Sequence, residues 1–435
     1  MPKAVNEREI ILDTLLQITR DGEYSHIALR GVLDKYQYLE KKKRSFITRV
    51  VEGTLERMIE IDYIINQFSK TPVQKMKPVI RTIVRSALYQ LKYMDQVPNS
   101  AVCNEAVKLT IKRGFATLRA FVNGVLRNIE RNLEQIVYPQ ESNVLQYLSV
   151  RYSMPEWILK QWLAVYSREV VEEMLREFLR DRPLSIRVNT NKIEVKQLEQ
   201  RLQSQGIEVT RDSEIPYALT LAKFDSLQRI PEFKEGLFYV QDVSSMQVAR
   251  KANPQAGDYV IDVCAAPGGK ALHIAEELKG TGHVKARDLT DYKVAFIQEN
   301  IEKFKLGNIE AMRQDATIFD EASKEKADIV IADLPCSGLG VLRKKSDLKY
   351  KMNEEMQREL VILQRKILTN VSEYVKRGGK LIYSTCTIHK QENEENTHWF
   401  IEQYPEYELK SEEQRLPGKA SGDGFYIAVF ERKQA

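Results

Sequence analysis

The sequence predicts a multidomain protein: an all-α helical bundle, then a small α+β module, then an α/β domain built on a doubly wound parallel sheet. Three observations predict this order. A length of 435 residues favours two or three domains over one. Apolar residues recur at helical spacing in the first third of the chain, and β-rich runs alternate with helical stretches from Gly257 onward. We expect domains at residues 1–140, 145–235 and 236–435.

The first segment has the spacing of a helical bundle. From Asn6 to about Tyr138, apolar side chains recur three and four residues apart, as in Ile80, Ile83 and Val84. Prolines and a glycine divide the segment into short helices, and no β-type alternation is present in it. This pattern predicts a helical bundle.

The middle segment, from Tyr147 to about Gln241, has a mixed pattern. Two helical stretches precede a strand-like run that begins at Leu184, and a further helix leads to a second β-rich run at Ile207. We expect a small α+β module that packs against the next domain.

The last segment alternates strands with helices. Its β-rich runs lie at residues 259–263, 283–286, 309–312, 329–332 and 381–384, and helical stretches separate them. Such alternation predicts a parallel sheet that binds its ligand at the carboxyl ends of the strands.

Cysteine usage and hydropathy exclude several classes of protein. The four cysteines are widely spaced and form no C-x-x-C pair, which argues against a disulfide scaffold or a zinc ribbon. No run of eighteen apolar residues occurs, and MPKAVNEREI lacks the apolar core of a signal peptide. We therefore expect a soluble, cytoplasmic monomer with no metal ion and no membrane contact.

Positive charge is concentrated in the predicted bundle. Between Asn66 and Arg131 there are twelve Lys or Arg residues against three acids, although the whole chain carries a net charge of only +5. Any single lysine is best explained as part of a solvated helical face. The cluster as a whole favours binding to a polyphosphate backbone.

A glycine-rich loop follows the first strand of the α/β domain. The run DVCAAPGGK, which ends at Lys270, closes this strand and opens a helix. Gly268 and Gly269 permit a tight turn and a close approach to a ligand, and Pro267 stiffens the turn. The loop has neither the G-x-G-x-x-G fingerprint nor the G-K-[ST] of a P-loop, so a dinucleotide or ATP is not the expected ligand.

Two acids follow the next two strands. Asp288 lies where an acidic side chain commonly accepts ribose hydroxyls, and Asp315 lies where it could meet the adenine end of a nucleoside. Either acid could instead cap a helix. Acids at the ends of successive strands favour the ligand interpretation.

Two cysteines follow the last two predicted strands. Cys336 lies in DLPCSG, which begins at Asp333, and Cys386 lies in YSTCT. Because carboxyl ends of parallel strands face one crevice, we expect both thiols and the Asp333 carboxylate to converge. A buried cysteine is usually inert, and we assign that role to Cys103. We expect His389 at a helix start or on the surface, with no catalytic role.

These blocks resemble a known family. The runs DVCAAPGGK, DLPCSG and YSTCT together look like those of the Sun (NSUN-type) family of RNA cytosine-C5 methyltransferases, and GDGFYIA is similar to that family's last hairpin. Upstream, LSIRVNTN and YVQDVSS resemble its pre-catalytic module, and FVNGVLR resembles NusB-type RNA-binding bundles. The resemblance spans nearly the whole chain, and the combination is typical of members that methylate 16S rRNA.

The resemblance implies a NusB-like bundle, a class I (Rossmann-like) methyltransferase domain and S-adenosylmethionine as cofactor. Cys386 would be the nucleophile that adds to C6 of cytosine, Cys336 would help to release the methylated RNA, and Asp333 would hold the N3/N4 edge. A thiolate at C6 turns the ring into an enamine whose C5 can attack a methyl sulfonium. The implied cofactor residues are Cys264, Ala265, Ala266, Pro267, Gly268, Gly269, Lys270, Asp288, Asp315 and Asp333. The nucleophile needs a lowered pKa, and no residue in the sequence identifies itself as the cause.

The implied substrate is 16S rRNA, naked or in a partly assembled small subunit, with the target cytidine in a loop or flipped out. Two alternatives stay open. The catalytic blocks alone do not select the RNA, so the substrate could be tRNA or another rRNA; the NusB-like bundle favours 16S rRNA. The chain could also be a non-catalytic RNA-binding assembly factor with a relic cofactor pocket, against which the presence of both Cys336 and Cys386 argues.

Overall fold

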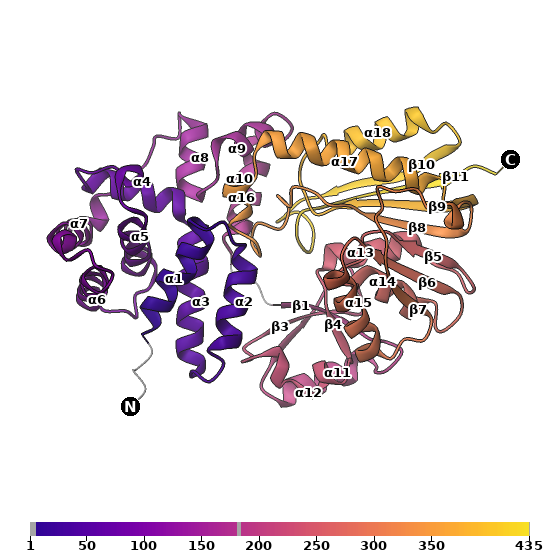
Figure 1. Ribbon diagram of the computed structural model, residues 1–435, viewed down its shortest axis with the longest axis horizontal. Helices are drawn as coiled ribbons and strands as arrows, with labels where there is room; N and C mark the ends of the chain where they lie inside the picture. The colour runs from indigo at the N-terminus through magenta and orange to yellow at the C-terminus, as the bar shows by residue number, and fades with distance from the viewer. Residues whose placement is uncertain (1–5, 181–183, 435) are drawn as a thin grey trace. The chain divides into compact units, whose positions relative to one another are not determined.

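The computed structural model describes residues 6–180 and 184–434. It divides into two units. The helical unit runs to Arg180 and also includes the segment Leu342–Lys351, and the sheet unit contains the remaining residues. Figure 1 traces both units along the chain. Among the described residues, no helix combines the length and the apolar character that crossing a membrane requires.

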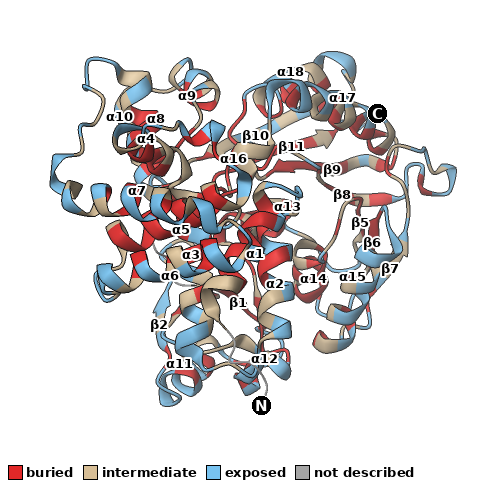
Figure 2. Ribbon diagram, turned by 60° about the vertical axis from the view of Figure 1, so that its left-hand side comes forward, coloured by how far each residue is buried: buried red, intermediate tan, exposed pale blue. Residues whose placement is uncertain are grey.

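The helical unit is all-α, as the sequence predicts. Its longer helices are α1 (Glu7–Thr19), α2 (Ser25–Lys35), α3 (Lys41–Glu56), α4 (Met58–Phe68), α5 (Pro78–Tyr93), α6 (Asn99–Lys112), α7 (Arg119–Arg131), α8 (Val144–Tyr152), α9 (Glu156–Leu163) and α10 (Arg168–Phe178). Helix α1 begins where the Asn6 side chain accepts from two backbone N–H groups of the first turn. Helix α5 begins at Pro78, whose missing N–H costs nothing there. Buried and exposed residues alternate along α1 and α3, so each presents one apolar face to a shared core (Figure 2). Helix α5 is buried along most of its length.

The segment Leu342–Lys351 belongs to the helical unit although it follows the Cys336 loop in the chain. The Asp347 carboxylate accepts from the backbone N–H and the hydroxyl of Ser25, the former at 3.0 Å. The Lys349 ammonium donates to the Glu56 carbonyl at 2.9 Å, and burial lowers the pKa of Lys349 to about 7. These satisfied polar contacts hold the segment, which includes α16 (Leu348–Lys351), in the helical unit.

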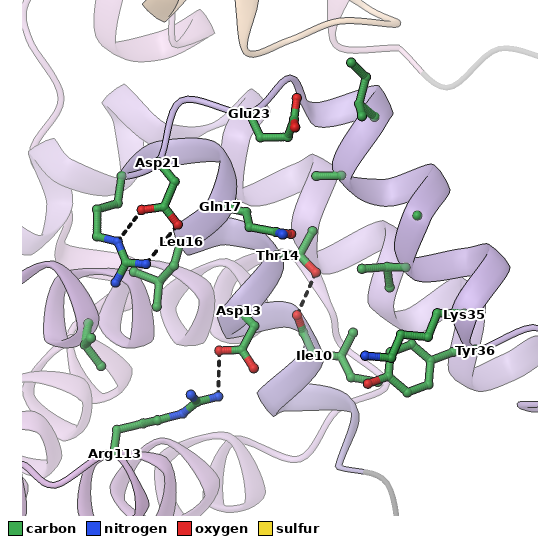
Figure 3. Close-up of a pocket in the computed structure, with 16 residues that line it drawn as sticks. Ile10, Asp13, Thr14, Leu16, Gln17, Asp21, Glu23, Lys35, Tyr36 and Arg113 are labelled. Atoms are coloured by element: carbon green, nitrogen blue, oxygen red, sulfur yellow. Dashed lines mark hydrogen bonds and ion pairs between the residues drawn. The ribbon is translucent and has the colours of Figure 1, made fainter.

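A cavity of about 740 Å³ lies in the helical unit and is lined mainly by α1 and α2. Four of its charged side chains form ion pairs: Arg113 lies 2.7 Å from Asp13, and Arg20 binds Asp21 (Figure 3). None of its lining residues belongs to the sheet unit.

A small α+β module opens the sheet unit. Its elements are β1 (Leu184–Val188), α11 (Val195–Ser204), β2 (Glu208–Arg211), β3 (Ala218–Ala222), α12 (Pro231–Lys234) and β4 (Phe238–Val240). The strands form an antiparallel sheet in the order β2-β3-β1-β4. A buried ion pair between Arg187 of β1 and Glu276 joins the module to the next domain.

The second sheet has seven strands in the order β10-β11-β9-β8-β5-β6-β7. The strands are β5 (Tyr259–Asp262), β6 (His283–Asp288), β7 (Ile309–Arg313), β8 (Ala327–Asp333), β9 (Val375–Thr385), β10 (Tyr407–Arg415) and β11 (Phe425–Arg432). The five expected strands are parallel, and the hairpin of β10 and β11 adds an antiparallel edge.

Helices cover both faces of this sheet. Helices α13 (Val243–Ala252), α14 (Gly269–Glu277) and α15 (Asp291–Phe304) lie along one face, and α17 (Glu354–Ser372) and α18 (Glu394–Gln403) lie along the other (Figure 1). Neighbouring residues of one strand enter different cores, as Val260 and Ile261 of β5 do, because successive side chains point to opposite faces. This is the doubly wound arrangement that the alternation predicts.

Strand β9 is longer than its predicted stretch at residues 381–384. It begins at Val375, and its first half contains Lys376, Gly378 and Gly379, which carry no β-rich signal. Its pairing with β8 shifts register between Ala327 and Ile329. The irregular register explains why alternation alone finds only the second half of the strand.

Candidate active site

The candidate site lies at the carboxyl ends of β5, β6, β8 and β9. The structure brings together the two thiols that the sequence places after β8 and β9: Cys336 Sγ lies 3.4 Å from Cys386 Sγ. Both cysteines are free, and this separation is longer than the S–S bond of about 2.05 Å in a disulfide. The hydrogen bond to Cys386, together with burial, raises the pKa of the Cys336 thiol. Both effects favour the protonated form of Cys336.

Backbone and side-chain hydrogen bonds fix the loop after β8 against the end of β9. The Leu334 N–H donates to the Ser384 carbonyl at 3.1 Å, and the Gly340 N–H donates to the Cys386 carbonyl at 3.0 Å. The Ser384 hydroxyl donates to Asp333 Oδ1 at 2.8 Å. The loop that carries Cys336 is thus fixed at both ends to the strand that carries Cys386.

Lys270 joins the glycine-rich loop to this pair of strands. Its ammonium lies 2.6 Å from Asp333 Oδ2 and 5.4 Å from the centre of the Phe425 ring. Burial disfavours the charged amine, but the interaction with the Asp333 carboxylate, with further contributions from Asp262 and Cys386, outweighs burial and raises the pKa of Lys270. Lys270 therefore carries a stable positive charge between an acid and a thiol.

The loop of residues 264–270, where we expect the cofactor, makes a tight turn at Gly268. Gly268 has a φ of 107°, a conformation that L side chains rarely adopt, and caps the start of α14. A Cβ on Gly269 would lie 3.1 Å from the Tyr239 ring, so the loop packs closely against Tyr239. The loop offers no phosphate cradle, which agrees with S-adenosylmethionine, a cation without phosphates.

Asp288, at the end of β6, is buried and supports the cofactor loop directly. Its carboxylate accepts from the Ala266 N–H at 3.0 Å, from the Leu289 N–H at 2.8 Å and from the Lys293 ammonium at 3.0 Å. A carboxylate has about four acceptor positions, so one remains for a hydroxyl group. A second would become available if the half-exposed Lys293 moved aside.

Asp315, after β7, makes a local turn. Its Oδ1 accepts from the backbone N–H and the hydroxyl of Thr317, at 2.8 and 2.7 Å, and these bonds lower the pKa of Asp315. Asp315 therefore closes a turn with Thr317 and does not cap a helix, because the next helical element begins at Glu321 with Asp320 as its N-cap. Its second oxygen, Oδ2, has no part in this turn.

Asp262, the last residue of β5, was not among the expected site residues. It is fully buried, and burial raises its pKa to about 8. The neighbouring Cys264 thiol also has its pKa raised by burial. An aspartate that ends an apolar strand is a signal that could have identified it, because burial of an acid is rare without a role.

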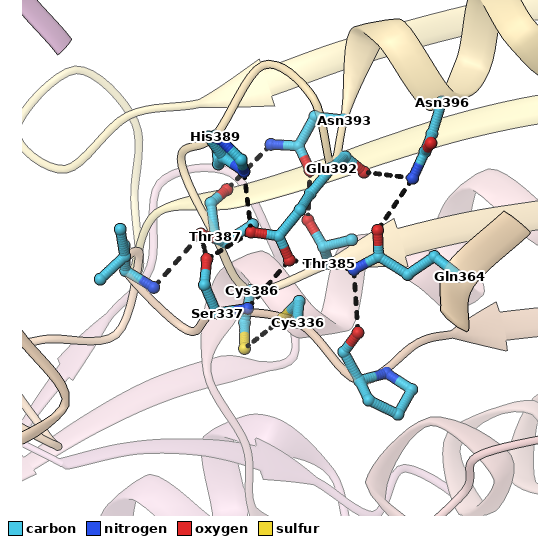
Figure 4. A network of polar contacts seen from close by, with 12 residues as sticks. Cys336, Ser337, Gln364, Thr385, Cys386, Thr387, His389, Glu392, Asn393 and Asn396 are labelled. Atoms are coloured by element: carbon cyan, nitrogen blue, oxygen red, sulfur yellow. Dashed lines mark hydrogen bonds and ion pairs between the residues drawn. The ribbon is translucent and has the colours of Figure 1, made fainter. Parts of the chain in front are cut away.

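Beneath the two cysteines lies a buried polar network (Figure 4). Glu392 is at its centre, and the Nδ1 atom of His389 lies 3.0 Å from Glu392 Oε1. His389 is only 8% exposed, so the expectation of a surface position is wrong. The residue looked exposed because the polar run QENEEN follows it closely in sequence. Among residues 6–180 and 184–434, no group of three or more His, Cys, Asp or Glu side chains is arranged to hold a metal ion.

Three family models match successive parts of the chain. Residues 5–131 match the NusB family, residues 154–228 match the ferredoxin-like domain of RsmF/B-like methyltransferases, and residues 249–431 match the 16S rRNA methyltransferase RsmB/F family. The order of these matches is that of the helical bundle, the α+β module and the seven-stranded domain.

Relatives match over the full length. The chain is 35% identical to the probable ribosomal RNA small subunit methyltransferase B of Bacillus subtilis, over 99% of this chain and 100% of the relative. It is 29% identical to the ribosomal RNA small subunit methyltransferase B of Proteus mirabilis, over 100% of both chains.

Solved structures agree with this fold. The crystal structure of the protein PH0851 matches with a TM-score of 0.83 and 26% identity, and the match covers 98% of this chain and 99% of that one. NSun6 from Pyrococcus horikoshii matches with a TM-score of 0.59 and 22% identity, over 65% of this chain and 99% of that one, which shows a shared fold. The chain therefore belongs to the ribosomal RNA small subunit methyltransferase B (RsmB) family and is an S-adenosylmethionine-dependent rRNA methyltransferase.

Proposed function

We propose that this enzyme methylates C5 of a cytidine in 16S rRNA through a covalent bond between Cys386 and C6 of the base. The observation that supports this most is the pair of free thiols at 3.4 Å beside the Lys270–Asp333 ion pair. The family resemblance of the YSTCT block is the reason for assigning the nucleophile to Cys386, and the raised pKa of the Cys336 thiol agrees with that assignment.

In the proposed reaction, the Cys386 thiolate bonds to C6 and pushes electrons toward C5. Bound S-adenosylmethionine supplies the methyl group. Asp333 accepts from the N3/N4 edge of the base and favours a protonated ring, which offsets the charge that the thiolate brings. Release then requires a base that takes the C5 proton. The electron pair of the C5–H bond forms the C5=C6 double bond again, and the electron pair of the C6–S bond returns to Cys386. We assign assistance in this release to Cys336.

The remaining assignments complete the proposal. Residues 1–140 would grip the RNA, residues 145–235 would be a small linker module, and residues 236–435 would carry the chemistry. The cofactor would contact the loop of residues 264–270 and the acids Asp288, Asp315 and Asp333. Asp288 has an acceptor position left for a ribose hydroxyl, whereas Asp315 could use only Oδ2 without breaking its turn.

The test uses purified full-length protein with S-adenosylmethionine and either 16S rRNA, 23S rRNA or tRNA transcripts. Bisulfite sequencing of the products should find one protected cytidine in 16S rRNA. Cys336→Ala should accumulate an RNA adduct that survives a denaturing gel, because it stalls before release, and Cys386→Ser should form neither adduct nor product. Methylation by Cys386→Ser at the wild-type rate would overturn the proposed mechanism. Preference for tRNA or 23S rRNA would overturn the substrate, and binding without methylation would favour an assembly factor.

A further inference from the structure

We propose that Glu392 is a positioning residue that holds the Cys336 loop in register with Cys386 and thereby sets the rate of product release. This inference rests on the proposed function. Glu392 follows Cys386 by six residues, lies between β9 and α18, and is 0% exposed. Figure 4 shows its carboxylate between the two cysteine-bearing segments.

The carboxylate holds the residue that follows Cys336. The Ser337 backbone N–H donates to Glu392 Oε2 at 2.9 Å, and the Ser337 hydroxyl donates to Oε1 at 2.5 Å. The same hydroxyl lies 2.7 Å from Thr387 Oγ1, one residue beyond Cys386. Main chain and side chain of Ser337 are thus both fixed, which leaves the Cys336 backbone little freedom to rotate.

A second arm of the network holds the residue that precedes Cys336. Gln364 Nε2 donates to Glu392 Oε2 and to the Pro335 carbonyl, each at 2.9 Å. The Glu392 carboxylate therefore acts on both flanks of Cys336, directly at Ser337 and through Gln364 at Pro335. His389 Nδ1, at 3.0 Å from Oε1, is the fourth group within hydrogen-bond distance.

The network does not act symmetrically on the two thiols. The Glu392 carboxylate contacts the DLPCSG block directly, whereas in the YSTCT block only the Tyr383 hydroxyl contacts Glu392, at its backbone carbonyl. Cys386 itself follows the end of strand β9, which pairs with β11. The negative charge of Glu392 also adds to the raised pKa of Cys336, after the hydrogen bond to Cys386 and burial. Loss of this carboxylate should therefore disturb Cys336 and the release step, and leave attack by Cys386 largely intact.

Glu392→Gln tests the role with minimal change in shape. The backbone N–H of Ser337 and Gln364 Nε2 both donate to Oε2, so an amide nitrogen at that position loses two hydrogen bonds. In the opposite orientation the charge is lost, and the Ser337 hydroxyl and His389 Nδ1 must both become acceptors. We expect kcat to fall about 10- to 100-fold, as for a displacement on the order of 1 Å in a catalytic group, with KM for RNA changed less than about 2-fold. The denaturation-resistant RNA adduct should accumulate above the wild-type level.

The matched control is Thr397→Val. Thr397 is also 0% exposed in this unit, and its hydroxyl makes one buried hydrogen bond, 2.7 Å to the Tyr426 hydroxyl. The Thr397→Val variant should have a lower free energy of unfolding but should not accumulate the RNA adduct. If Glu392→Gln is poorly folded, Ser337→Ala removes one of the four contacts and should raise the adduct level in the same direction but less.

The outcomes separate this inference from the proposed function. An adduct with Cys336→Ala but none above wild type with either Glu392→Gln or Ser337→Ala overturns the positioning role alone. Absence of an adduct with Cys336→Ala overturns the proposed function. A parallel loss of activity and folded protein in Glu392→Gln and Thr397→Val, with no adduct in either, reduces Glu392 to a purely structural residue.

Discussion

The ammonium of Lys270 lies 2.6 Å from Asp333 Oδ2, although the two residues are 63 positions apart in the chain. One comes from the glycine-rich loop after β5 and the other ends β8. The family resemblance implies that Lys270 is a cofactor residue, whereas in the structure its positive charge interacts with Asp333 and with Cys386. A positive charge beside a thiol favours its thiolate form. Sequence patterns alone did not identify Lys270 as the group that could supply this charge.

Lys270→Met should slow the enzyme most at neutral pH. Without the ammonium, less thiolate is present at Cys386, and we expect the rate of adduct formation near pH 7 to fall about 10- to 100-fold, with partial recovery in more alkaline buffer. Single-turnover methylation across a pH series measures this. The control is Lys376→Met, which removes a Lys–Asp pair at the opposite end of β8, where Lys376 lies 2.9 Å from Asp328. A uniform loss at all pH values would mean that Lys270 only holds the loop in place.

The basic cluster of the helical unit is partly neutralised within the fold. Six of its twelve Lys and Arg residues form ion pairs: Arg85, Lys92, Lys108, Lys112, Arg113 and Arg127. Lys70, Lys75, Lys77, Arg119 and Arg131 are exposed. The exposed group is the better candidate for phosphate contacts, and a count from sequence overstates the positive charge available to RNA.

Replacement of Lys70, Lys75 and Lys77 by Gln should weaken RNA binding in a salt-dependent way. Each lost phosphate contact should reduce the slope of log K against log salt by about 0.7 to 0.9. Filter binding of 16S rRNA fragments at several salt concentrations measures the slope. Gln at Lys108 and Lys112 is the control, because both are ion-paired at 2.7 Å. If the triple variant and the double variant had equal slopes, the exposed lysines would be excluded as the contact surface.

Local motifs and periodic patterns in the sequence predicted most of the fold and part of the candidate site. Alternation of strands and helices predicts that Cys336, Cys386 and Asp333 meet at the sheet edge, and they do so because parallel strands end at one edge. Partners between loops follow no periodicity, so the Lys270–Asp333 pair was not predictable. The sequence did not indicate a role for Glu392 for another reason. This residue lies in the run QENEEN, whose composition is typical of an exposed loop, yet its side chain is fully buried.

His273 should make the sheet unit sensitive to acid. It is 3% exposed, and burial lowers its pKa from 6.5 to about 4. Between these values the unfolded chain binds a proton and the folded chain does not, so the stability contribution is complete above about pH 6.5 and is lost as pH falls toward 4. From about pH 7.5 to about pH 5 the loss should be about 2 kcal/mol. Urea unfolding of His273→Gln should have a smaller pH dependence, and an unchanged dependence would place the acid-sensitive group elsewhere.

Gly53 and Gly124 form a matched pair for the packing of the helical unit. A Cβ on Gly53 of α3 would lie 2.0 Å from Cζ of the buried Tyr89 in α5, whereas a Cβ on Gly124 of α7 would meet nothing within 4 Å. Gly53→Ala should therefore lower the free energy of unfolding by about 1 to 3 kcal/mol, because the ring must move within a packed core. Gly124→Ala should raise it by about 0.5 to 1 kcal/mol, since alanine loses less entropy in a helix. Thermal unfolding followed by circular dichroism compares the two, and a stable Gly53→Ala protein would mean that α3 and α5 separate without cost.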